Sequence, residues 1–460
     1  MADDLANGWG CTLVHLDGRS SRQFVEGNGF KRLEEVVRKT TKQQFTLAKV
    51  AACGSDANVF ATLEATNGNT SRMCIAAGSY VAGDHSILQN WSSSHFDIHD
   101  GLALISDPSE VHSEIATEHT VALPYRIPCD SCLHSINQVE EYEDLCLDSL
   151  HARLLSAKLF NRPFNSLLLE LVLGGNGASL SIRAYNKLAL ICRHHHINCV
   201  VDEALTGARC GPSMLLTQTL PLDFQNVVTH VTMAKWPGIG MVLLNEKNKT
   251  ETASSKRGQS TEISCDYAIK LWETADSLLH IIPDRRKAVL KAMKLSETDA
   301  WGTGLMLYGP KRRNDSKKSL KNRYLPLLAS TPVDKINFQQ RADMTKECVC
   351  QNIKRMVMSW VNHYPKVLEK EERGDHGLVG WLFCQEISKP GWKGRFFRRE
   401  DMSKALQDSG HPRAVDVVVL RGVLKTAVEA DILSETQNGA KRTRGYKVLG
   451  ICHLDSSRKV

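Results

Sequence analysis

Long apolar stretches are missing from this 460-residue sequence. No run approaches the roughly 18 to 20 apolar residues that a membrane-spanning helix needs, so we expect no membrane partner. The first ten residues, MADDLANGWG, are acidic, whereas a secretory leader is basic and then apolar. We therefore expect a cytoplasmic protein.

Zinc-ribbon cysteine spacing is missing as well, although the chain has 14 cysteines. The CDSC segment at 129–132 and the CVC segment at 348–350 each lack a second close pair at ribbon spacing, so we expect no metal site. Cysteines such as Cys53, Cys192 and Cys199 lie inside expected strands and helices, which favours buried free thiols in a reducing compartment.

The chain also has no strong excess of one charge. Its net charge is +7, with 24% charged and 42% apolar residues, which is ordinary for a globular protein and implies little about nucleic acid. Much of the positive charge is local, because residues 311–323 (KRRNDSKKSLKNR) carry seven basic side chains and one acidic side chain. We favour an exposed insertion loop there over a nucleic-acid contact.

The sequence does contain a carboxylate and a lysine that each follow an apolar run. Residues 199–201 read as a buried parallel strand that ends at Asp202, and open α/β sheets bind ligands at such carboxyl ends. A second apolar run, 227–233, lies just before Lys235. A carboxylate that keeps a pyridine nitrogen protonated and an amine that forms a Schiff base are what pyridoxal 5'-phosphate (PLP) requires.

Four motifs in order carry a resemblance to a known family. DEALTGARCG at 202–211, followed by THVTMAKWPGIG at 229–240, resembles the class III (omega) aminotransferase signature, which reads roughly DEVQTGFGRTG and then TLAKGLGGG. Upstream, ACGSDAN at 52–58 is similar to the family's SGSDAN, and GSYVAGD at 78–84 to its GSYHG. The segment 169–197 resembles the stretch that begins EPVQGNGGV. Together the motifs cover a little under half of the chain.

The resemblance implies an α/β protein of the fold-type I PLP class, a three-layer sandwich with a mainly parallel sheet and a smaller α+β C-terminal domain. It implies a PLP-dependent aminotransferase that exchanges an amino group between a small-molecule amino donor and an oxo acceptor. Lys235 would form the Schiff base and Asp202 would protonate the ring. The implied cofactor-binding residues are Gly54, Ser55, Asp56, Tyr80, Glu170, Asp202, Ala204, Lys235 and Thr261.

Two of these implied roles concern the cofactor's phosphate and ring. Gly54 and Ser55 open an expected helix whose N-terminus suits a dianionic phosphate, and Tyr80 would stack on the ring. In the family, the threonine that Thr261 matches binds the phosphate of the neighbouring subunit. The resemblance therefore implies a homodimer.

Several positions depart from the family pattern. Leu205 replaces a glutamine that hydrogen-bonds the cofactor's phenolic oxygen, Val81 replaces a histidine, and Trp236 and Pro237 interrupt the glycines after the lysine. Two alternatives to a transaminase therefore stay open. One is another PLP reaction such as racemisation, aminomutation or decarboxylation, and the other is a non-catalytic descendant that binds a partner protein or nucleic acid.

We expect four parts along the chain: a short segment at 1–50, a large PLP-binding domain at 51–270, a helix and basic insertion loop at 271–345, and a small domain at 346–460. A helix at about 139–159 has the pattern of surface decoration. The three histidines at 194–196 are interpreted as a solvated helix end.

The C-terminal part allows two interpretations. For the small-domain strand of the family we favour residues 373–383 over 301–309, because a helix at 347–361 precedes the former. After it, two helices and a basic hairpin containing Arg442, Arg444 and Lys447 match either the small domain of a transaminase or the outline of a winged helix.

Overall fold

The structure is a computed structural model of the full chain. It describes residues 28–79, 94–96, 103–105, 118–127, 136–174, 176–234, 237, 239–248, 262–292, 296–298, 300–310, 339–341, 346–371, 375–392, 394–409, 417–438 and 443–449.

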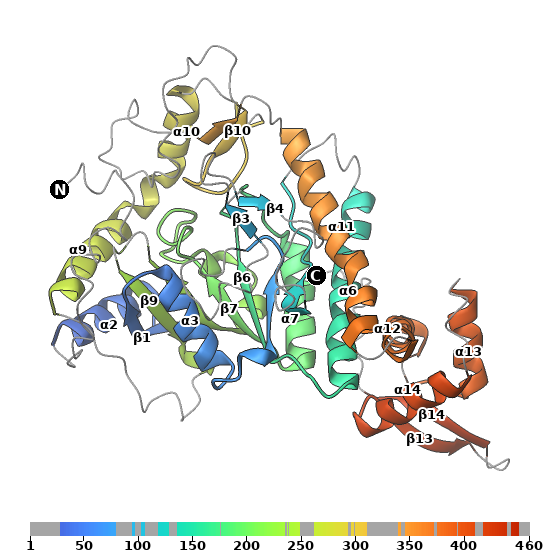
Figure 1. Ribbon diagram of the computed structural model, residues 1–460. Helices are drawn as coiled ribbons and strands as arrows, with labels where there is room; N and C mark the ends of the chain where they lie inside the picture. The colour runs from blue at the N-terminus through green and yellow to red at the C-terminus, as the bar shows by residue number, and fades with distance from the viewer. Residues whose placement is uncertain are drawn as a thin grey trace.

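A seven-stranded sheet organises the first two-thirds of the chain (Figure 1). In spatial order its strands are β1 (Phe45–Ala51), β9 (Gly240–Asn245), β8 (Val228–Met233), β7 (Asn198–Asp202), β6 (Ser166–Glu170), β2 (Met73–Ala76) and β5 (Thr120–Val121). Only β9 runs antiparallel to its neighbours, and the other paired strands are parallel. The central strands are buried along nearly their whole length, as parallel strands covered on both faces are. The predicted α/β class with a mainly parallel sheet is confirmed.

Helices cover both faces of this sheet. On one face lies α3 (Gly54–Ala65), whose Ala57, Val59 and Ala61 pack on Leu168 and Val200 of the sheet. On the other face lie α6 (Ile136–Leu159), α7 (Ile182–His195) and the short α8 (Leu222–Gln225). At the β1 edge, α2 (Asn28–Thr40) packs against α9 (Glu262–Leu278), which α10 (Ile282–Ala292) follows. The result is the predicted three-layer sandwich.

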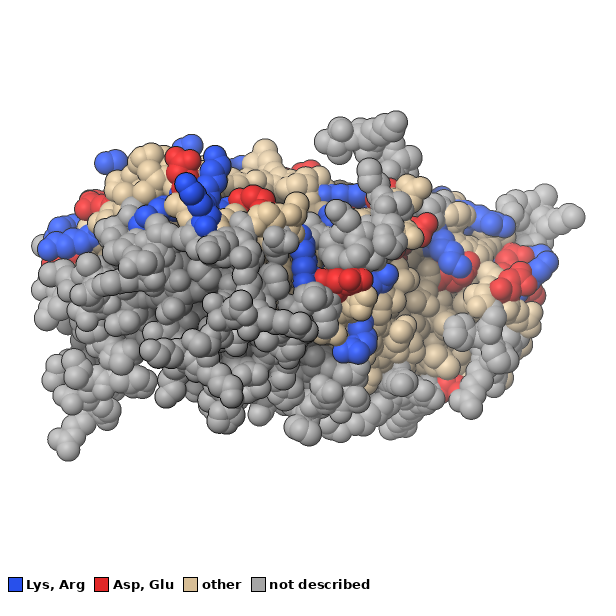
Figure 2. All heavy atoms as spheres, turned by 90° about the horizontal axis from the view of Figure 1, so that it is seen from above, with Lys and Arg blue, Asp and Glu red and all other residues tan. Residues whose placement is uncertain are grey.

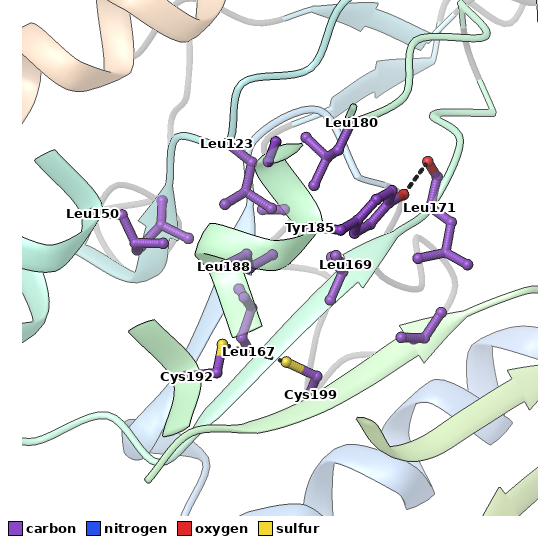
Figure 3. Packing of buried hydrophobic residues seen from close by; sticks show 14 of the residues in the cluster. Leu123, Leu150, Leu167, Leu169, Leu171, Leu180, Tyr185, Leu188, Cys192 and Cys199 are labelled. Atoms are coloured by element: carbon purple, nitrogen blue, oxygen red, sulfur yellow. Dashed lines mark hydrogen bonds between the residues drawn. The ribbon is translucent and has the colours of Figure 1, made fainter. Parts of the chain in front are cut away.

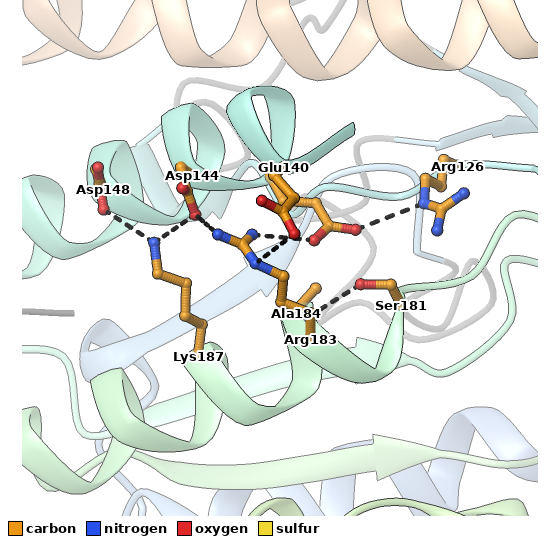
Figure 4. Close-up of polar contacts among 9 residues, drawn as sticks. Arg126, Glu140, Asp144, Asp148, Ser181, Arg183, Ala184 and Lys187 are labelled. Atoms are coloured by element: carbon orange, nitrogen blue, oxygen red, sulfur yellow. Dashed lines mark hydrogen bonds and ion pairs between the residues drawn. The ribbon is translucent and has the colours of Figure 1, made fainter. Parts of the chain in front are cut away.

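The helix α6 is a core element, and the prediction of surface decoration was wrong. Its Leu147 and Leu150 are fully buried in the core that α7 shares with β6 and β7 (Figure 3). Among its acidic residues, Asp144 binds Lys187 of α7 at 2.5 Å and Arg183 at 2.6 Å (Figure 4). Charges on α6 thus face charges on α7, which a sequence pattern cannot distinguish from charges that face water.

The three histidines at the end of α7 also differ from their prediction as a solvated helix end. His151 of α6 and His195 share a hydrogen bond of 2.8 Å between Nδ1 and Nε2. The ring of His194 lies 5.5 Å from that of His151. Burial, followed by the neighbouring His151, holds the pKa of His195 well below its ordinary value. Only His196, which ends the helix in the left-handed conformation, is exposed.

The chain then passes through smaller elements into a C-terminal unit. Two short pairs are β3 (Ser94–Phe96) with β4 (Ala103–Ile105) and β10 (Tyr308–Pro310) with β11 (Gln339–Arg341). The long α11 (Lys346–Glu371) leads to α12 (Asp375–Ile387), β12 (Phe396–Phe397), α13 (Arg399–Asp408), α14 (Val417–Glu429), β13 (Leu433–Asn438) and β14 (Thr443–Val448). The last three strands form a separate sheet in the order β12-β14-β13.

The choice of a small-domain strand was wrong. The favoured segment, 373–383, contributes to the helix α12, whereas the alternative segment that had been left open, 301–309, reaches the strand β10. The apolar run GLVGWLF in α12 is buried except for the half-buried Leu378, and Gly380 lies against Phe160 and Leu159 at the end of α6. A short, continuously apolar run fits a buried helix and a buried strand equally well, so periodicity did not separate them.

The described surface carries both signs of charge. Viewed from above, basic and acidic side chains are both scattered over the described part of the surface, with uncharged areas between them (Figure 2). None of the helices in the described ranges combines the length and the apolar character that crossing a bilayer requires.

Candidate active site at the carboxyl ends of the parallel strands

Three polar residues form a row across neighbouring strands at the carboxyl edge of the sheet. In the strand registers, Glu170 of β6 pairs with Asp202 of β7, and Asp202 pairs with Thr232 of β8. Paired residues of parallel strands point to the same face of a sheet. That face is covered by α3, because Leu168 and Val200, two residues earlier, pack against α3. The row therefore faces the helix that begins at Gly54.

Asp202 is held by a hydrogen-bond chain that links three elements. The side chain is 7% exposed. Its Oδ2 accepts a hydrogen bond of 2.7 Å from Asn58 Nδ2 on α3, and its Oδ1 accepts one of 2.8 Å from the backbone N–H of Ala204. Asn58 Oδ1 in turn accepts from Thr232 Oγ1 at 2.6 Å. The carboxylate is thus fixed in position by β7, α3 and β8 together.

The N-terminus of α3 meets the ends of β7 and β8. A Cβ atom on Gly54 would lie 3.0 Å from the Cβ of Ala234 and 3.4 Å from that of Ala204. Ser55 is buried and Asp56 is half-buried in the first turn. The first turn of any helix presents backbone N–H groups and the positive end of its dipole. The structure thus brings Gly54, Ala204 and Asp202 together beside Ala234, the residue that precedes Lys235.

Glu170 lies in the same row, but its carboxylate is hydrogen-bonded to the loop that follows β6. Its Oε2 accepts a hydrogen bond of 2.6 Å from the backbone N–H of Gly174. A Cβ on Gly174 would lie 2.3 Å from Leu205 Cδ1, so a larger residue here would require the end of that leucine side chain to move. Leu205 therefore packs an apolar side chain over the loop after β6, where the family pattern has an amide.

The adjacent Glu203 points elsewhere and has a structural role. Its carboxylate accepts hydrogen bonds from the backbone N–H groups of Leu216 at 2.7 Å and Thr217 at 2.8 Å, and from the hydroxyls of Thr217 at 2.6 Å and Thr206 at 3.1 Å. Burial raises the pKa of Glu203, while the hydrogen bonds from Thr217 and Leu216 oppose that shift. This side chain fixes the loop that follows Asp202.

Arg209 in the same loop is a buried cation. It is 4% exposed, and burial lowers its pKa to about 10. Its Nη1 donates to the carbonyl oxygen of Leu205 at 3.0 Å, and within the described ranges no carboxylate pairs with it. A buried guanidinium in this setting suits binding of an acidic group.

Three of the predicted site residues, Tyr80, Lys235 and Thr261, lie outside the described residues. For Lys235 the structure places the residue before it, Ala234, against Gly54. Within the described ranges, no group of three or more His, Cys, Asp or Glu side chains is arranged to hold a metal ion.

Asn58 and Thr232 were not identified from the sequence as site residues. Asn58 is the last residue of the motif ACGSDAN and lies four residues after Gly54, hence on the same face of α3. That spacing was a usable signal for Asn58. The pairing of Thr232 with Asp202 depends on strand register, for which the sequence offered no signal.

No family model matches this chain, and no curated protein matches it in sequence. Similar solved structures include aminotransferases. One is an amine transaminase from an uncultivated Pseudomonas species in a PLP-bound form, with 14% identity over 67% of this chain and 73% of the other, at a TM-score of 0.43. Another is the lysine aminotransferase from M. tuberculosis, with 12% identity over 80% and 86%, at 0.43. A third is a phospholyase from Arthrobacter in complex with phosphoethanolamine, with 15% identity over 77% and 86%, at 0.48. Likenesses this low assign neither an activity nor a ligand to this chain.

Proposed function

We propose that this protein binds PLP at the carboxyl edge of its large sheet and transfers an amino group between an amine or amino acid and an oxo-acid or aldehyde. The observation that carries the proposal is the fixed carboxylate of Asp202, held by Asn58 beside the start of α3 and the end of β8. Lys235 follows that end directly.

The described residues fit the chemistry of this cofactor. A carboxylate oxygen accepts more than one hydrogen bond, so Asp202 can accept from a protonated ring nitrogen while keeping Asn58 and Ala204 as donors. Backbone N–H groups at the start of α3 suit the phosphate, and Gly54 allows a close approach there. Ala204, whose side chain lies in contact distance of Gly54, would contact the ring.

Each residue then has a defined task. When bound, PLP supplies an electron-accepting ring and a reactive aldehyde carbon. Asp202 keeps the ring nitrogen protonated, because a nearby negative charge favours the charged form of a base. The amine of Lys235 holds the aldehyde carbon and, once released by the incoming amine, moves the proton at the substrate Cα.

Substrate preference and assembly follow from two further residues. Arg209 is the buried cation nearest in sequence to Asp202, and we propose that it binds a carboxylate of the substrate. Thr261 is proposed to bind the phosphate of the neighbouring subunit, so that the active unit is a homodimer. Leu205 cannot donate the hydrogen bond of the family's glutamine, so the cofactor's phenolic oxygen needs another donor.

The first experiment is reconstitution of the purified protein with PLP. We expect a visible absorbance band that is abolished in Lys235→Ala. Reduction with borohydride followed by peptide mass spectrometry should place the pyridoxyl group on Lys235. Lys49 is the matched control, because burial lowers the pKa of its amine and so makes it more nucleophilic than an ordinary surface lysine. Lys49→Ala should keep the band.

The second experiment tests the reaction. Wild-type protein is incubated with a panel of amino donors and oxo acceptors, and the products are identified by mass spectrometry. Transfer of the amino group supports the proposal, whereas inversion, migration of the amino group or loss of carbon dioxide would indicate one of the alternative PLP reactions. A folded protein that stays colourless with excess PLP would overturn the proposal.

A further inference from the structure

The C-terminal unit, from α12 to β14, consists of helices and strands that are not part of the large sheet. From α12 to β14 the chain forms helix, strand, helix, helix and hairpin, with β12 added beside β14. Leu420, Val423, Leu424 and Ala427 of α14 are buried, and α14 packs on α12, α13 and β13. In Figure 1 the elements α13, α14, β13 and β14 project away from the seven-stranded sheet. Their outer surface is therefore accessible to a partner.

The outward face of α14 carries two basic side chains. Val418, Arg421 and Lys425 follow one another at helical spacing on the side opposite the buried residues, and all three are exposed. The side chain of Val418 is 76% exposed, and that of Lys425 is 78% exposed. A helix is about 10 to 12 Å across, which matches the roughly 12 Å width of the B-form DNA major groove.

The hairpin beside this helix is basic as well. From Asn438 through Lys447 the sequence has four Lys or Arg residues and no Asp or Glu, and Arg444 and Lys447 on β14 are exposed, as is Glu435 on β13. Burial, and next the charge of Glu435 on β13, raise the pKa of Tyr446 on the same strand, while the charges of Arg399 on α13 and Arg421 on α14 act against that shift. Because α14 packs on α13 and β13, and β13 pairs with β14, these elements lie around one surface.

Two acidic side chains on this surface are engaged in ion pairs. Glu400 pairs with Arg399 at 3.0 Å, and Glu429 pairs with Lys425 at 3.7 Å. Glu435 stands opposite Tyr446 in the hairpin. Exposed pairs of this kind are weak and screened by salt, so a polyanion with a higher density of negative charge can replace the carboxylates as the partner of the basic side chains.

We propose that this C-terminal unit is a winged helix that binds double-stranded DNA, with α14 in the major groove and the β13–β14 hairpin on the flanking phosphates. A protein partner is less suited, because the cores of protein interfaces are depleted in lysine and enriched in aromatic residues. An RNA duplex is excluded by groove shape, because its deep, narrow major groove does not admit a helix. The exposed Val418 can contact a thymine methyl group.

The test uses the full-length protein and a fluorescein-labelled, 24-base-pair DNA duplex in fluorescence anisotropy. We expect a Kd of about 10⁻⁴ to 10⁻⁶ M near physiological salt, and tighter binding at low salt. The double variant Arg421→Ala/Arg444→Ala should weaken binding about tenfold or more at low salt. It should also reduce the slope of log K against log salt by about two, because each of the two arginines would neutralise one phosphate in the wild type.

The matched control removes the same charge elsewhere. Arg32 and Lys287 are exposed on α2 and α10, with side chains 60% and 75% exposed, and Arg32→Ala/Lys287→Ala should bind as the wild type does. Arg421→Lys/Arg444→Lys should keep the salt slope, which separates removal of charge from misfolding. Absence of DNA binding at low salt would overturn the proposal. Equal weakening by the control pair, or equal affinity for an RNA duplex, would also overturn it. The visible absorbance of bound PLP reports independently on the other site.

Discussion

The carboxyl edge of the large sheet and the C-terminal unit use charge in opposite ways. At the sheet edge, Asp202 and Glu203 are buried, and their oxygens accept hydrogen bonds from residues fixed by other elements. In the C-terminal unit, the half-buried Arg399 and the exposed Lys425 pair with neighbours on their own helices. The contrast separates charges that the fold has positioned from charges that remain exchangeable.

This difference has an energetic origin. A buried charge is tolerated only when several donors or acceptors satisfy it, so the residues around Asp202 leave it little freedom of position. An exposed ion pair contributes little to stability and constrains nothing. A reaction that needs a carboxylate at a fixed place therefore belongs at the sheet edge. Binding of a long polyanion, in which many weak contacts add up, suits the C-terminal unit.

The largest expected effect comes from Asp202→Asn. Under the proposed function, the rate of amino-group transfer should fall about 10- to 1,000-fold, because an opposite charge within about 4 to 6 Å shifts a pKa by roughly 1 to 3 units. Steady-state kinetics measure the rate. The matched variant is Glu203→Gln next to it, whose amide nitrogen would face the N–H of Leu216 or Thr217. It should lose about 1 to 3 kcal/mol of unfolding free energy with little change in rate. If both variants had the same kinetic effect, the two acids would not differ in role.

Next is Gly445→Ala, which tests whether the two regions are independent. A Cβ at this position would lie 2.3 Å from the ring of Phe396 and 2.7 Å from the carbonyl oxygen of Phe397. Such crowding costs about 1 to 3 kcal/mol, so amide hydrogen exchange in β13 and β14 should speed up. The absorbance of bound PLP should stay unchanged. Gly391→Ala is the control, because nothing lies within 4 Å of the added atom.

From the histidine pair between α6 and α7 we predict that the unfolding free energy of the large region falls at acidic pH. The folded-state pKa of His195 lies well below its ordinary value, so protonation favours the unfolded chain. The unfolding free energy that neutral His195 contributes is fully present above the unfolded-state pKa of about 6.5. As the pH falls below that value, this free energy is lost by up to about 1.4 kcal/mol per pH unit. Urea unfolding at several pH values should show a shallower slope for His195→Gln. The exposed control His280→Gln should keep the wild-type slope.

The smallest expected effect is that of Lys425→Ala on stability. Its pair with Glu429 is exposed and should contribute less than about 0.5 kcal/mol, so the midpoint of thermal unfolding should stay nearly constant. The same substitution should reduce the salt slope of DNA binding by about one. A large loss of stability would show that this lysine is a structural residue and not an exchangeable contact.

Much of the large region could be predicted from the sequence. The apolar run before Asp202 indicated β7, and the Gly-Ser turn before an apolar helix indicated α3; both elements are present. The prediction of α6 as decoration and of 373–383 as a strand failed for a shared reason. In both segments the deciding partner is another helix, α7 for the charges of α6 and α6 for the glycine of α12. The residue pattern of one segment does not show which other segment packs against it.

By itself, the sequence determined which residue types stand at the ends of which strands, because hydrophobic period and turn residues are local properties. It thereby placed Asp202 and Gly54 at element ends. Only the tertiary structure decided that Asn58 hydrogen-bonds both Asp202, 144 residues later, and Thr232, 174 residues later. Strand register and the position of α3 on the sheet depend on the packing of the whole sheet. Packing also decided that acids of α6 pair with bases of α7 and that the bases of α14 face outward. The physical reason is that a charged side chain either pairs with another group or faces solvent, depending on which element packs opposite it. The folded structure sets which element that is.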